Sequence, residues 1–510
     1  MAKLNKNRSV IIIGAGFAGM AAGIYARLNG FSTKIYELHN LPGGLCTSWN
    51  RKGYTFDACI HWLVGSSPAS GLHDLWEETG IIKNTRIIDH DEYMRLEDTK
   101  GRTLVFYTNL DKLEKHLLEF SPADEKPIKE LINGVKICLN FDMPSKHDPF
   151  LRKTAKNLRT VRNFVINGRK MQKWMKITCG EFAGRFSDPL IRQAINEMWI
   201  PEFSIFFMLF TLAYMHNRNA GYPAGGSLPM SKDMENRYRE LGGTILYKKR
   251  VTEIITEGDK AVGIKTEDGI TDHADFIISA ADGYSTIFKM LGNRFGNNET
   301  REPYEKWPLF PSLIFVSLGV NRRFDEIPWS VSGLTFQLKE PLIVGDRIRD
   351  KISLHIYNHD ESLAPAGKTA ITIMMGTDYD YWKKISENRT EYLTAKNAVY
   401  ETIIKIIEQR FPGISSQIEV YDVATPLTFE RYTGNWKGSF EGWLITPENS
   451  YTLMKPMSQT IPGLRNFYMC GQWVEPGGGL PTAVMSGKRL IKKLCRDEGI
   501  RFSTSLKGGL

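Results

Sequence analysis

A β-branched run that leads directly into a glycine-rich turn constrains the fold of this 510-residue chain more than any other feature. The run, Ser9–Ile13, has no polar alternation, which is typical of a strand buried on both faces of a parallel sheet. A turn of the form Gly-x-Gly-x-x-Gly follows, in which glycine allows a tight bend, close approach of backbone to phosphate, and close helix packing. The residues expected at the bound phosphates are Gly14, Gly16, Phe17, Ala18 and Gly19.

The residues after this turn complete a βαβ unit that ends in an acidic side chain. Residues 20–29 are rich in alanine and predict a helix, which Asn29 and Gly30 end. Residues 33–36 predict a second strand, directly followed by Glu37. A carboxylate about 20 residues beyond the glycines can accept hydrogen bonds from both hydroxyls of an adenosine ribose, and it would repel a 2′-phosphate. Together these elements predict a Rossmann-type dinucleotide site.

A second glycine pair indicates which dinucleotide this site binds. Gly43, Gly44 and Leu45 follow soon after the acid, in the sequence Leu-Pro-Gly-Gly-Leu-Cys. The segment resembles the loop by which many FAD enzymes pass a second stretch of backbone across the pyrophosphate. We therefore expect FAD as the cofactor.

The carboxy-terminal part of the chain carries another glycine-rich turn. Residues 467–470 predict a strand that runs into Gly471, and the glycine triplet 477–479 precedes a predicted helix at 483–494. A glycine turn that opens a helix presents free N–H groups and the positive end of the helix dipole. The sequence therefore predicts a second place where backbone can face an anionic group.

Residues 11–45 and 466–490 together resemble the phytoene desaturase, carotenoid isomerase and retinol saturase family of FAD oxidoreductases. In that family the carboxy-terminal helix start faces the flavin, where it would stabilise negative charge on the reduced ring. Residues 222–226 resemble the family's Tyr-Pro-x-Gly-Gly element. The resemblance implies further cofactor contacts at Val251, beside the adenine, and at Gly471, Gly478, Gly479, Leu480, Pro481 and Ala483.

The predicted fold class is α/β: a three-layer Rossmann-type FAD-binding domain with an inserted α+β substrate domain and a helical, membrane-facing subregion. We expect the FAD domain in three pieces, residues 1–100, 216–290 and 456–510. A helical substrate and membrane-facing region, 101–215, and a substrate-domain sheet, 291–455, are expected between them. In the latter, β-rich runs predict strands at 313–318, 352–357, 369–374 and 418–421, with a helix at 391–410.

The segment after the first glycine pair supplies the candidate catalytic residues. By analogy with the family it returns toward the flavin, so His61 and Trp62 are the candidates for a polar and an aromatic group beside the ring. His61 could equally be an ordinary hydrogen-bonded histidine. His355 and His359 are weaker candidates, because isolated histidines often complete a core or a loop.

A strongly basic segment bears on the partner of the protein. Residues 151–180 contain nine Lys or Arg and no Asp or Glu, with apolar residues near helical spacing. A basic amphipathic helix of this kind is typical of a membrane interface with anionic lipid, and the alternative is the solvated face of a core helix. Residues 203–215 are aromatic-rich but shorter than the roughly 20 apolar residues that span a bilayer. We expect them to be buried or to line a tunnel for an acyl or polyene chain.

Composition and missing motifs argue against several other classes of protein. Six scattered cysteines form no Cys-x-x-Cys pair, so we expect neither disulfides nor a metal site. The polar start of the chain predicts no secretory signal, and we expect a cytoplasmic protein, peripheral on the inner face of the membrane. The net charge of +9 is concentrated in the basic segment, which favours a membrane surface over nucleic acid. Because no hydrolase, metalloprotease or P-loop motif is visible, the flavin must carry the reaction.

The leading hypothesis is FAD-dependent desaturation or saturation of carbon–carbon bonds in a long apolar lipid, such as a carotenoid or related isoprenoid. One alternative is non-redox isomerisation or hydration of a double bond in a carotenoid or fatty-acid chain. Another is an amine-oxidase-like flavoenzyme, although the basic segment would repel a cationic amine. Lipid-group escorts of small GTPases also resemble this fold, but the retained Glu37 and glycines oppose that alternative. Quinone, oxygen and NAD(P)H all stay open as redox partners.

Overall fold

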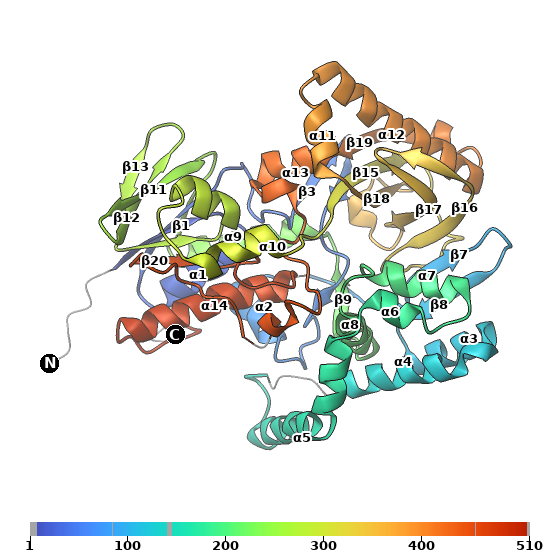
Figure 1. Ribbon diagram of the computed structural model, residues 1–510, viewed down its shortest axis with the longest axis horizontal. Coiled ribbons are helices and arrows are strands. Elements are labelled where there is room, and N and C mark those ends of the chain that lie inside the picture. Colours follow the sequence, from blue (N-terminus) through green and yellow to red (C-terminus); the bar gives the residue numbers. More distant parts are fainter. Residues whose placement is uncertain (1–7, 84, 140–144, 454, 507–510) are drawn as a thin grey trace.

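The computed structural model describes residues 8–83, 85–139, 145–453 and 455–506, and it contains two main sheets with helices around them (Figure 1). The residues on which the secretory-signal prediction rests, 1–7, lie outside the described part. The first sheet has five parallel strands in the order β10-β2-β1-β14-β20. In that order the strands are Thr244–Leu246, Ser32–Tyr36, Ser9–Ile13, Phe276–Ser279 and Phe467–Met469. Segments far apart in the sequence therefore build one sheet.

The central strand β1 shows why the first predicted strand is apolar throughout. Its side chains alternate between two cores: Val10 and Ile12 pack with the helices on one face, while Ile11 and Ile13 pack with a small antiparallel sheet on the other. That small sheet consists of β11 (Val251–Glu257), β12 (Lys260–Thr266) and β13 (Thr271–His273). Helix, parallel sheet and antiparallel sheet form three layers, and the predicted α/β class is confirmed.

Three helices cover the other face of the first sheet: α1 (Phe17–Leu28), α9 (Ser227–Glu240) and α14 (Leu480–Asp497). The closest packing is between α1 and α14, where a Cβ added at Gly487 would lie only 2.6 Å from the carbonyl oxygen of Ala18. Helix α14 begins at Leu480, three residues before its predicted start. Its first turn therefore follows the glycine triplet directly.

The second sheet has seven strands in the order β19-β15-β18-β17-β16-β7-β8, and every pair except β16 and β7 is antiparallel. All four strands predicted between 313 and 421 belong to it, and the predicted helix at 391–410 lies within α12. Helices α11 (Tyr379–Ile385) and α12 (Arg389–Arg410) pack their apolar side chains into the core of this sheet. Its strands are β7 (Glu92–Glu97), β8 (Thr103–Tyr107), β15 (Ser312–Val320), β16 (Leu334–Val344), β17 (Arg347–Ile356), β18 (Thr369–Thr377) and β19 (Ile418–Ala424).

The domain boundary predicted at residue 100 is wrong, because β7 and β8 form one hairpin across it. Asp98 holds the hairpin turn by accepting hydrogen bonds from the backbone N–H groups of Lys100 and Arg102, each at 2.9 Å. Strand β7 also pairs with β16, more than 200 residues later in the chain. The chain therefore enters the second sheet before residue 100.

A group of helices joins the two sheets: α3 (Leu110–Phe120), α4 (Glu125–Cys138), α5 (Phe150–Met175), α6 (Cys179–Ala183), α7 (Pro189–Met198) and α8 (Ile205–His216). Helix α5 lies at the lower edge of Figure 1 and packs against α8. It ends before residue 180 because a capping box at Thr178 starts α6, with the Thr178 side chain accepting from the N–H of Glu181 at 3.1 Å. Among the described helices, none combines the length and the apolar character needed to cross a bilayer.

The remaining elements are short. The strands are β3 (Ser48–Arg51), β4 (Tyr54–Asp57), β5 (Leu63–Val64), β6 (Ile87–Ile88) and β9 (Ala220–Pro223). The helices are α2 (His73–Thr79), α10 (Asn298–Lys306) and α13 (Pro426–Thr433). Single helical turns lie at Pro122–Asp124, Ser285–Met290, Glu361–Leu363, Ile414–Gln417, Trp436–Gly438 and Ser450–Leu453.

Candidate cofactor and substrate site

A cavity of about 1330 Å³ brings together residues from the first sheet, the second sheet and helices α5 and α8. It is larger than the roughly 300–1,000 Å³ of ordinary small-molecule pockets, so it has room for a dinucleotide and a second molecule. Nearly all the residues predicted from the sequence line it. They are Gly14, Gly16, Phe17, Ala18, Glu37, Gly43, Gly44, Leu45, His61, Trp62, Val251, Gly471, Gly478, Gly479, Leu480, Pro481 and Ala483.

Gly19 is the predicted cofactor residue that does not line the cavity. A Cβ added there would lie 2.0 Å from the carbonyl oxygen of Gly14 and 3.1 Å from the Cβ of Ala280. Only glycine therefore lets α1 pack this close to the end of β1. The structure gives Gly19 a packing role in place of the predicted cofactor contact.

Two glycine-rich backbones lie side by side at the first end of the cavity. Gly16 and Gly43 form a parallel bridge, and the N–H of Gly43 donates to the carbonyl of Ala15 at 2.9 Å. A Cβ added at Gly16 would meet only the carbonyl oxygen of Gly43, at 4.0 Å, so it would project into the cavity. The bare backbone leaves a space at this point that the pyrophosphate of FAD fits.

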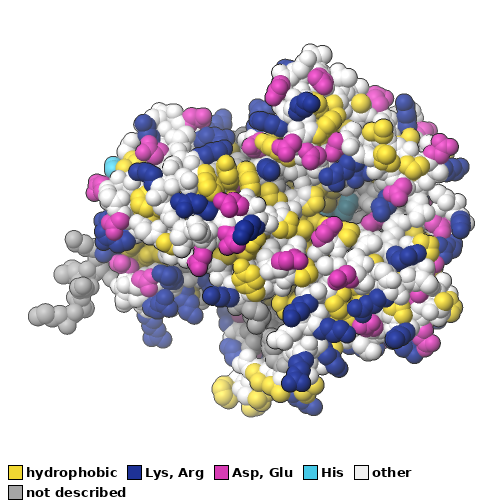
Figure 2. All heavy atoms as spheres, in the orientation of Figure 1, with side chains coloured by type: hydrophobic (Ala, Val, Ile, Leu, Met, Phe, Trp, Pro, Cys, Tyr) yellow, Lys and Arg dark blue, Asp and Glu magenta, His cyan; other side chains and the backbone are white. Residues whose placement is uncertain are grey.

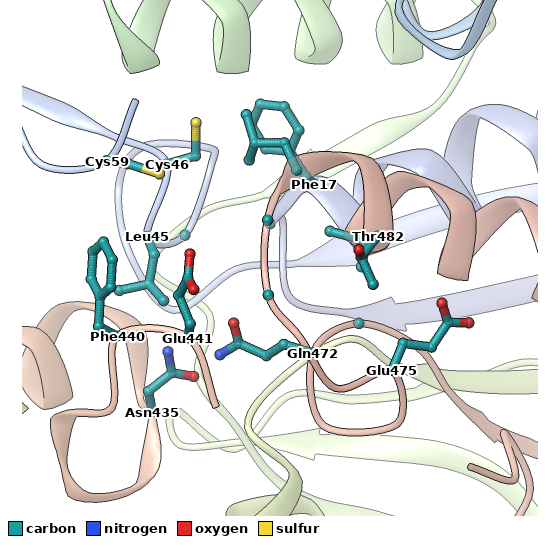
Figure 3. A pocket seen from close by; sticks show the side chains of 18 of the residues that line it. Phe17, Leu45, Cys46, Cys59, Asn435, Phe440, Glu441, Gln472, Glu475 and Thr482 are labelled. Atoms are coloured by element: carbon teal, nitrogen blue, oxygen red, sulfur yellow. The ribbon is translucent and has the colours of Figure 1, made fainter. Parts of the chain in front are cut away.

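The N-termini of two helices also face the cavity. Gly16 precedes α1 and Gly479 precedes α14, and in both helices the described residues provide no side-chain cap for the first N–H groups. The start of α14 lines the cavity through Leu480, Pro481 and Thr482, the last of which is labelled in Figure 3. Uncapped N–H groups and the positive end of the helix dipole favour an anion. These two helix starts fit the phosphates and the reduced ring of a flavin dinucleotide.

Glu37 lines the cavity together with Arg250 and Val251, at the end where the adenosine is expected. Its carboxylate accepts hydrogen bonds from the N–H groups of Ala15 at 2.7 Å and His39 at 2.8 Å. Burial raises the pKa of Glu37, while these hydrogen bonds and the charge of Arg250 oppose that rise. In the structure Glu37 therefore holds the phosphate turn to the end of β2, and its contact with the ribose stays a prediction.

His61 and Trp62 line the cavity beyond the glycine loops. Burial lowers the pKa of His61 to about 4, so its ring is neutral at pH 7. The His61 ring lies 4.4 Å from that of His355, and Trp62 packs 6.0 Å from the ring of Tyr93. The structure thus brings together His61 and His355, two of the histidines singled out in the sequence.

Glu441 is a cavity residue that the sequence did not reveal. In Figure 3 it lies with Leu45, Asn435, Phe440 and Gln472 at one end of the view. Its carboxylate is next to the glycine triplet, since a Cβ added at Gly478 would lie 2.5 Å from Oε2 of Glu441. Burial raises the pKa of Glu441 to about 7. The only signal in the sequence is an acid between Phe440 and Gly442, and no periodicity or glycine pattern marks it.

The far end of the cavity is apolar and aromatic. The rings lining it there include Trp62, Trp199, Phe207, Phe210 and Tyr214. Three of these come from α8, the aromatic run whose burial or tunnel-lining position was predicted. Beyond them the cavity reaches α5 at Asn157 and Thr160. A continuous space therefore connects the glycine loops with the basic helix.

Proteins of similar sequence belong to a flavin-binding family and include carotenoid enzymes. The sequence model of a family described as flavin containing amine oxidoreductase matches residues 17–490. The chain is 23% identical over 506 residues to the lycopene-forming phytoene desaturase of Pseudescherichia vulneris, covering 96% of this chain and 99% of that protein. It is 22% identical over 520 residues to the chloroplastic prolycopene isomerase of Daucus carota, covering 97% of this chain and 81% of that protein.

Solved structures share the fold at lower identity. Cyclohexylamine oxidase from Brevibacterium oxydans superposes with a TM-score of 0.59 at 12% identity, covering 97% of this chain and 100% of that one. An oxidoreductase from Methanosarcina mazei superposes with a TM-score of 0.58 at 15% identity, covering 95% of this chain and 100% of that one. These likenesses extend over both sheets of the fold.

Replacing Gly16 by leucine tests whether the space beside the Gly16 and Gly43 backbones holds the pyrophosphate of FAD. The backbone at Gly16 has φ −72°, which any residue adopts, so the substitution introduces no backbone strain. Its side chain would enter the cavity, and a clash above ~1.4 kcal/mol would lower flavin binding about tenfold. The measurement is the ratio of flavin to protein absorbance in purified protein. Gly168→Leu is the control, because a Cβ there meets nothing within 4 Å; equal flavin content in both variants would contradict the assignment.

Replacing Glu441 by glutamine tests the buried carboxyl. The pKa of Glu441 is raised to about 7 in the folded protein, so its contribution to stability is present below the unfolded pKa and is lost as pH rises through 7. Glutamine has no such loss. We expect Glu441→Gln to raise the melting temperature relative to wild type more at pH 8 than at pH 5. The control is Glu257→Gln at an exposed position, which should change the melting temperature by the same amount at both pH values. A change in melting temperature for Glu441→Gln that does not depend on pH would refute the raised pKa of Glu441.

Proposed function

This chain belongs to the flavin containing amine oxidoreductase family and is an FAD-dependent oxidoreductase, as predicted, and we propose that its substrate is a long apolar lipid. The proposed reaction is desaturation or saturation of carbon–carbon bonds in a carotenoid or related isoprenoid. Relatives named phytoene desaturase and prolycopene isomerase support this substrate class. We further propose that the protein works in the cytoplasm at the inner face of a membrane.

The observation that carries this proposal is the continuous cavity between the glycine loops and the aromatic wall. His61, Trp62, the rings of α8 and residues of α5 all line it together with the glycine loops. Such a space offers a polyene apolar contact over its length, and burying each CH₂ group stabilises binding by about 0.8 kcal/mol. A small polar substrate would leave most of this wall uncovered.

The residues around the cofactor have separable roles. The glycine loops at Gly16 and Gly43 and the start of α14 would hold FAD, which supplies hydride transfer when it is bound. The positive end of α14 would stabilise negative charge on the reduced ring. His61 is neutral at pH 7, so in its resting state it offers one hydrogen-bond donor and one acceptor without placing a charge against an apolar substrate. Trp62 packs against Tyr93 and Trp199, and these rings would exclude water from the reacting bond.

Helix α5 supports the membrane part of the proposal. Leu151, Leu158 and Val165, at intervals of seven residues, are 80%, 65% and 80% exposed. Phe150, Val161 and Ile166 on the same helix are also exposed. Figure 2 shows apolar and basic side chains together at the bottom of the molecule, where α5 lies in Figure 1. An apolar stripe flanked by Lys and Arg suits the boundary of an anionic bilayer.

Two other reactions fit the same cofactor frame. Isomerisation or hydration of a double bond would use the same apolar cavity, as the name of the prolycopene isomerase suggests. Amine oxidation is favoured by carboxyl groups that line the cavity, among them Glu197 and Glu441, which could pair with a cation. However, Glu197 already forms an ion pair with Lys351, and burial raises the pKa of both acids. A lipid substrate therefore accounts for the aromatic lining of the cavity better than a cationic amine does.

Lipid turnover is the direct test. Flavin-loaded protein is mixed anaerobically with phytoene or prolycopene in anionic vesicles, with quinone, oxygen or NAD(P)H then supplied as the redox partner. We expect the flavin spectrum to change in proportion to lipid converted, and the product mass to change by pairs of hydrogens.

The product mass also separates the alternatives. An unchanged mass with altered double-bond geometry would favour isomerisation, and a gain of water would favour hydration. Bleaching by an amine such as cyclohexylamine, with no response to any lipid, would refute the proposal in favour of amine oxidation.

Vesicle binding tests the role of α5. Each exposed side chain that enters the interface should contribute roughly 1.5–3 kcal/mol, so Leu158→Glu with Val165→Glu should weaken partition into anionic vesicles at least about 100-fold. Cosedimentation measures this. Ile343→Glu with Ile348→Glu adds the same charges to the β16–β17 hairpin, where these residues are 69% and 72% exposed, and should leave binding unchanged. Equal binding by both double variants would rule out α5 as the membrane contact.

A further inference from the structure

A group of buried side chains near the second sheet has polar atoms without partners. No described residue hydrogen-bonds to either ring nitrogen of His359 or to Nδ1 of His90. The ring of Tyr222, whose hydroxyl lies beside Asp360, packs against His359. The three rings are close: His359 lies 4.8 Å from His90 and 4.9 Å from Tyr222. His359 and His90 are 8% and 9% exposed and Tyr222 is 1% exposed.

Unpaired polar atoms in such a place are costly. A buried polar atom without a hydrogen bond destabilises a protein, so the unpaired nitrogens of these two neighbouring rings point to ordered water beside them. Water bound here would have several partners within reach, as buried water requires. A metal ion is a poor alternative, because these histidines do not form a set of three ligand atoms within 4.8 Å among the described residues.

The group connects to the cavity through two more histidines. His61 lines the cavity and its ring lies 4.4 Å from His355. His355 is at the end of β17, four residues before His359. Burial lowers the pKa of His355 well below its usual range, and the neighbouring His61 and His359 lower it further. Ring contacts thus join His61 to His355 and His359 to His90, and His61 and His359 both lie close enough to His355 to influence its ring.

The other end of the set approaches the surface. Asp91, directly after His90, is exposed, and its charge opposes the lowering of the His90 pKa by burial. Trp329, which is 47% exposed, lies 5.9 Å from His359. Solvent is therefore one residue away from the outer histidine.

We propose that His61, His355, His359 and His90, linked by ordered water, form a relay that carries protons between the cavity and the surface near Asp91. Each neutral imidazole takes a proton at one ring nitrogen and releases another from the second, so the relay moves a proton and no electrons. His61 touches the substrate space, and the other three are positioning residues that act through it.

A dry cavity needs such a route. This inference rests on the proposed function: removing two hydrogens from a carbon–carbon bond sends a hydride to the cofactor and leaves one proton to be exported, and saturation needs one proton imported. With the lipid in place, water cannot carry that proton through the apolar end of the cavity. Histidines with pKa values of about 4 and 3, as at His90 and His359, pass protons without retaining them at pH 7.

Proton exchange at the ring of His355 tests the relay without any turnover. The chain has ten histidines, so selective ¹⁵N-histidine labelling gives a spectrum that can be assigned by substitution. Flavin-loaded protein in lipid vesicles is transferred to D₂O, and the loss of the ring N–H signal is timed. We expect His359→Phe to slow this exchange at least about tenfold. An unchanged exchange rate in His359→Phe would overturn the relay.

Two further variants keep the test clear of folding effects. His359→Gln can hydrogen-bond to the same water but has no imidazole to pass a proton, and it should slow exchange as His359→Phe does. His147→Phe replaces an exposed histidine that pairs with Glu77 at 2.7 Å, away from the relay. In this control variant the ring N–H of His355 should exchange at the wild-type rate. Wild-type exchange in His359→Gln would likewise overturn the relay.

Lipid turnover gives a second readout. If wild-type protein converts phytoene, His359→Ala should slow turnover about tenfold, and free imidazole should restore it by filling the vacated space. Failure of imidazole to restore activity in a folded, flavin-loaded variant would count against the relay. If wild-type protein converts no lipid, the proposed function fails, and the exchange measurement still decides whether the relay exists.

Discussion

The whole architecture depends on two stretches of bare backbone meeting where two helices begin. Gly16 and Gly43 pair through their backbones, and a Cβ at Gly16 would project into open space. At Gly16 and Gly479 none of the described side chains caps the helix. Unsatisfied N–H groups at a helix start need an anion, water or a cap. The pyrophosphate and the flavin would supply these partners, so that bound FAD would hold α1, α14 and both glycine loops together. The second sheet and the helices between the sheets are attached to this frame and determine what else the cavity admits.

Burial has the same effect on both acids and histidines around the cavity. It lowers the pKa of His61 to about 4 and raises that of Glu441 to about 7, so each group tends toward its uncharged form near neutrality. An apolar wall that keeps its own titratable groups neutral disfavours charged substrates as well. The same physical property therefore links the aromatic end of the cavity, the neutral histidines and the choice of an uncharged lipid as the proposed substrate.

The cofactor side could be predicted from the sequence because turn chemistry is local. Gly14, Gly44 and Gly471 have positive φ angles, a conformation that favours glycine, and the pattern is visible within a few residues. Glu441 and His90 gave no signal, because their importance comes from residues far away in the chain. The β7–β8 hairpin was assigned to the wrong part for a similar reason: its pairing with β16 depends on a segment more than 200 residues later. Gly19 fits the pattern but serves packing, since a glycine motif does not show which member touches the ligand.

The arrangement of the first sheet has a consequence for how the protein is made. Strand β20 and helix α14 come from the last tenth of the chain, yet they form one edge of the sheet and one wall of the cofactor cavity. During synthesis the ribosome releases β1, β2 and β14 long before their final neighbour exists. A growing polypeptide therefore presents an incomplete cofactor site, and loading with FAD has to wait until α14 has been synthesised. Cofactor supply would then influence the protein from that point on, when the empty fold either captures FAD or is exposed to proteases.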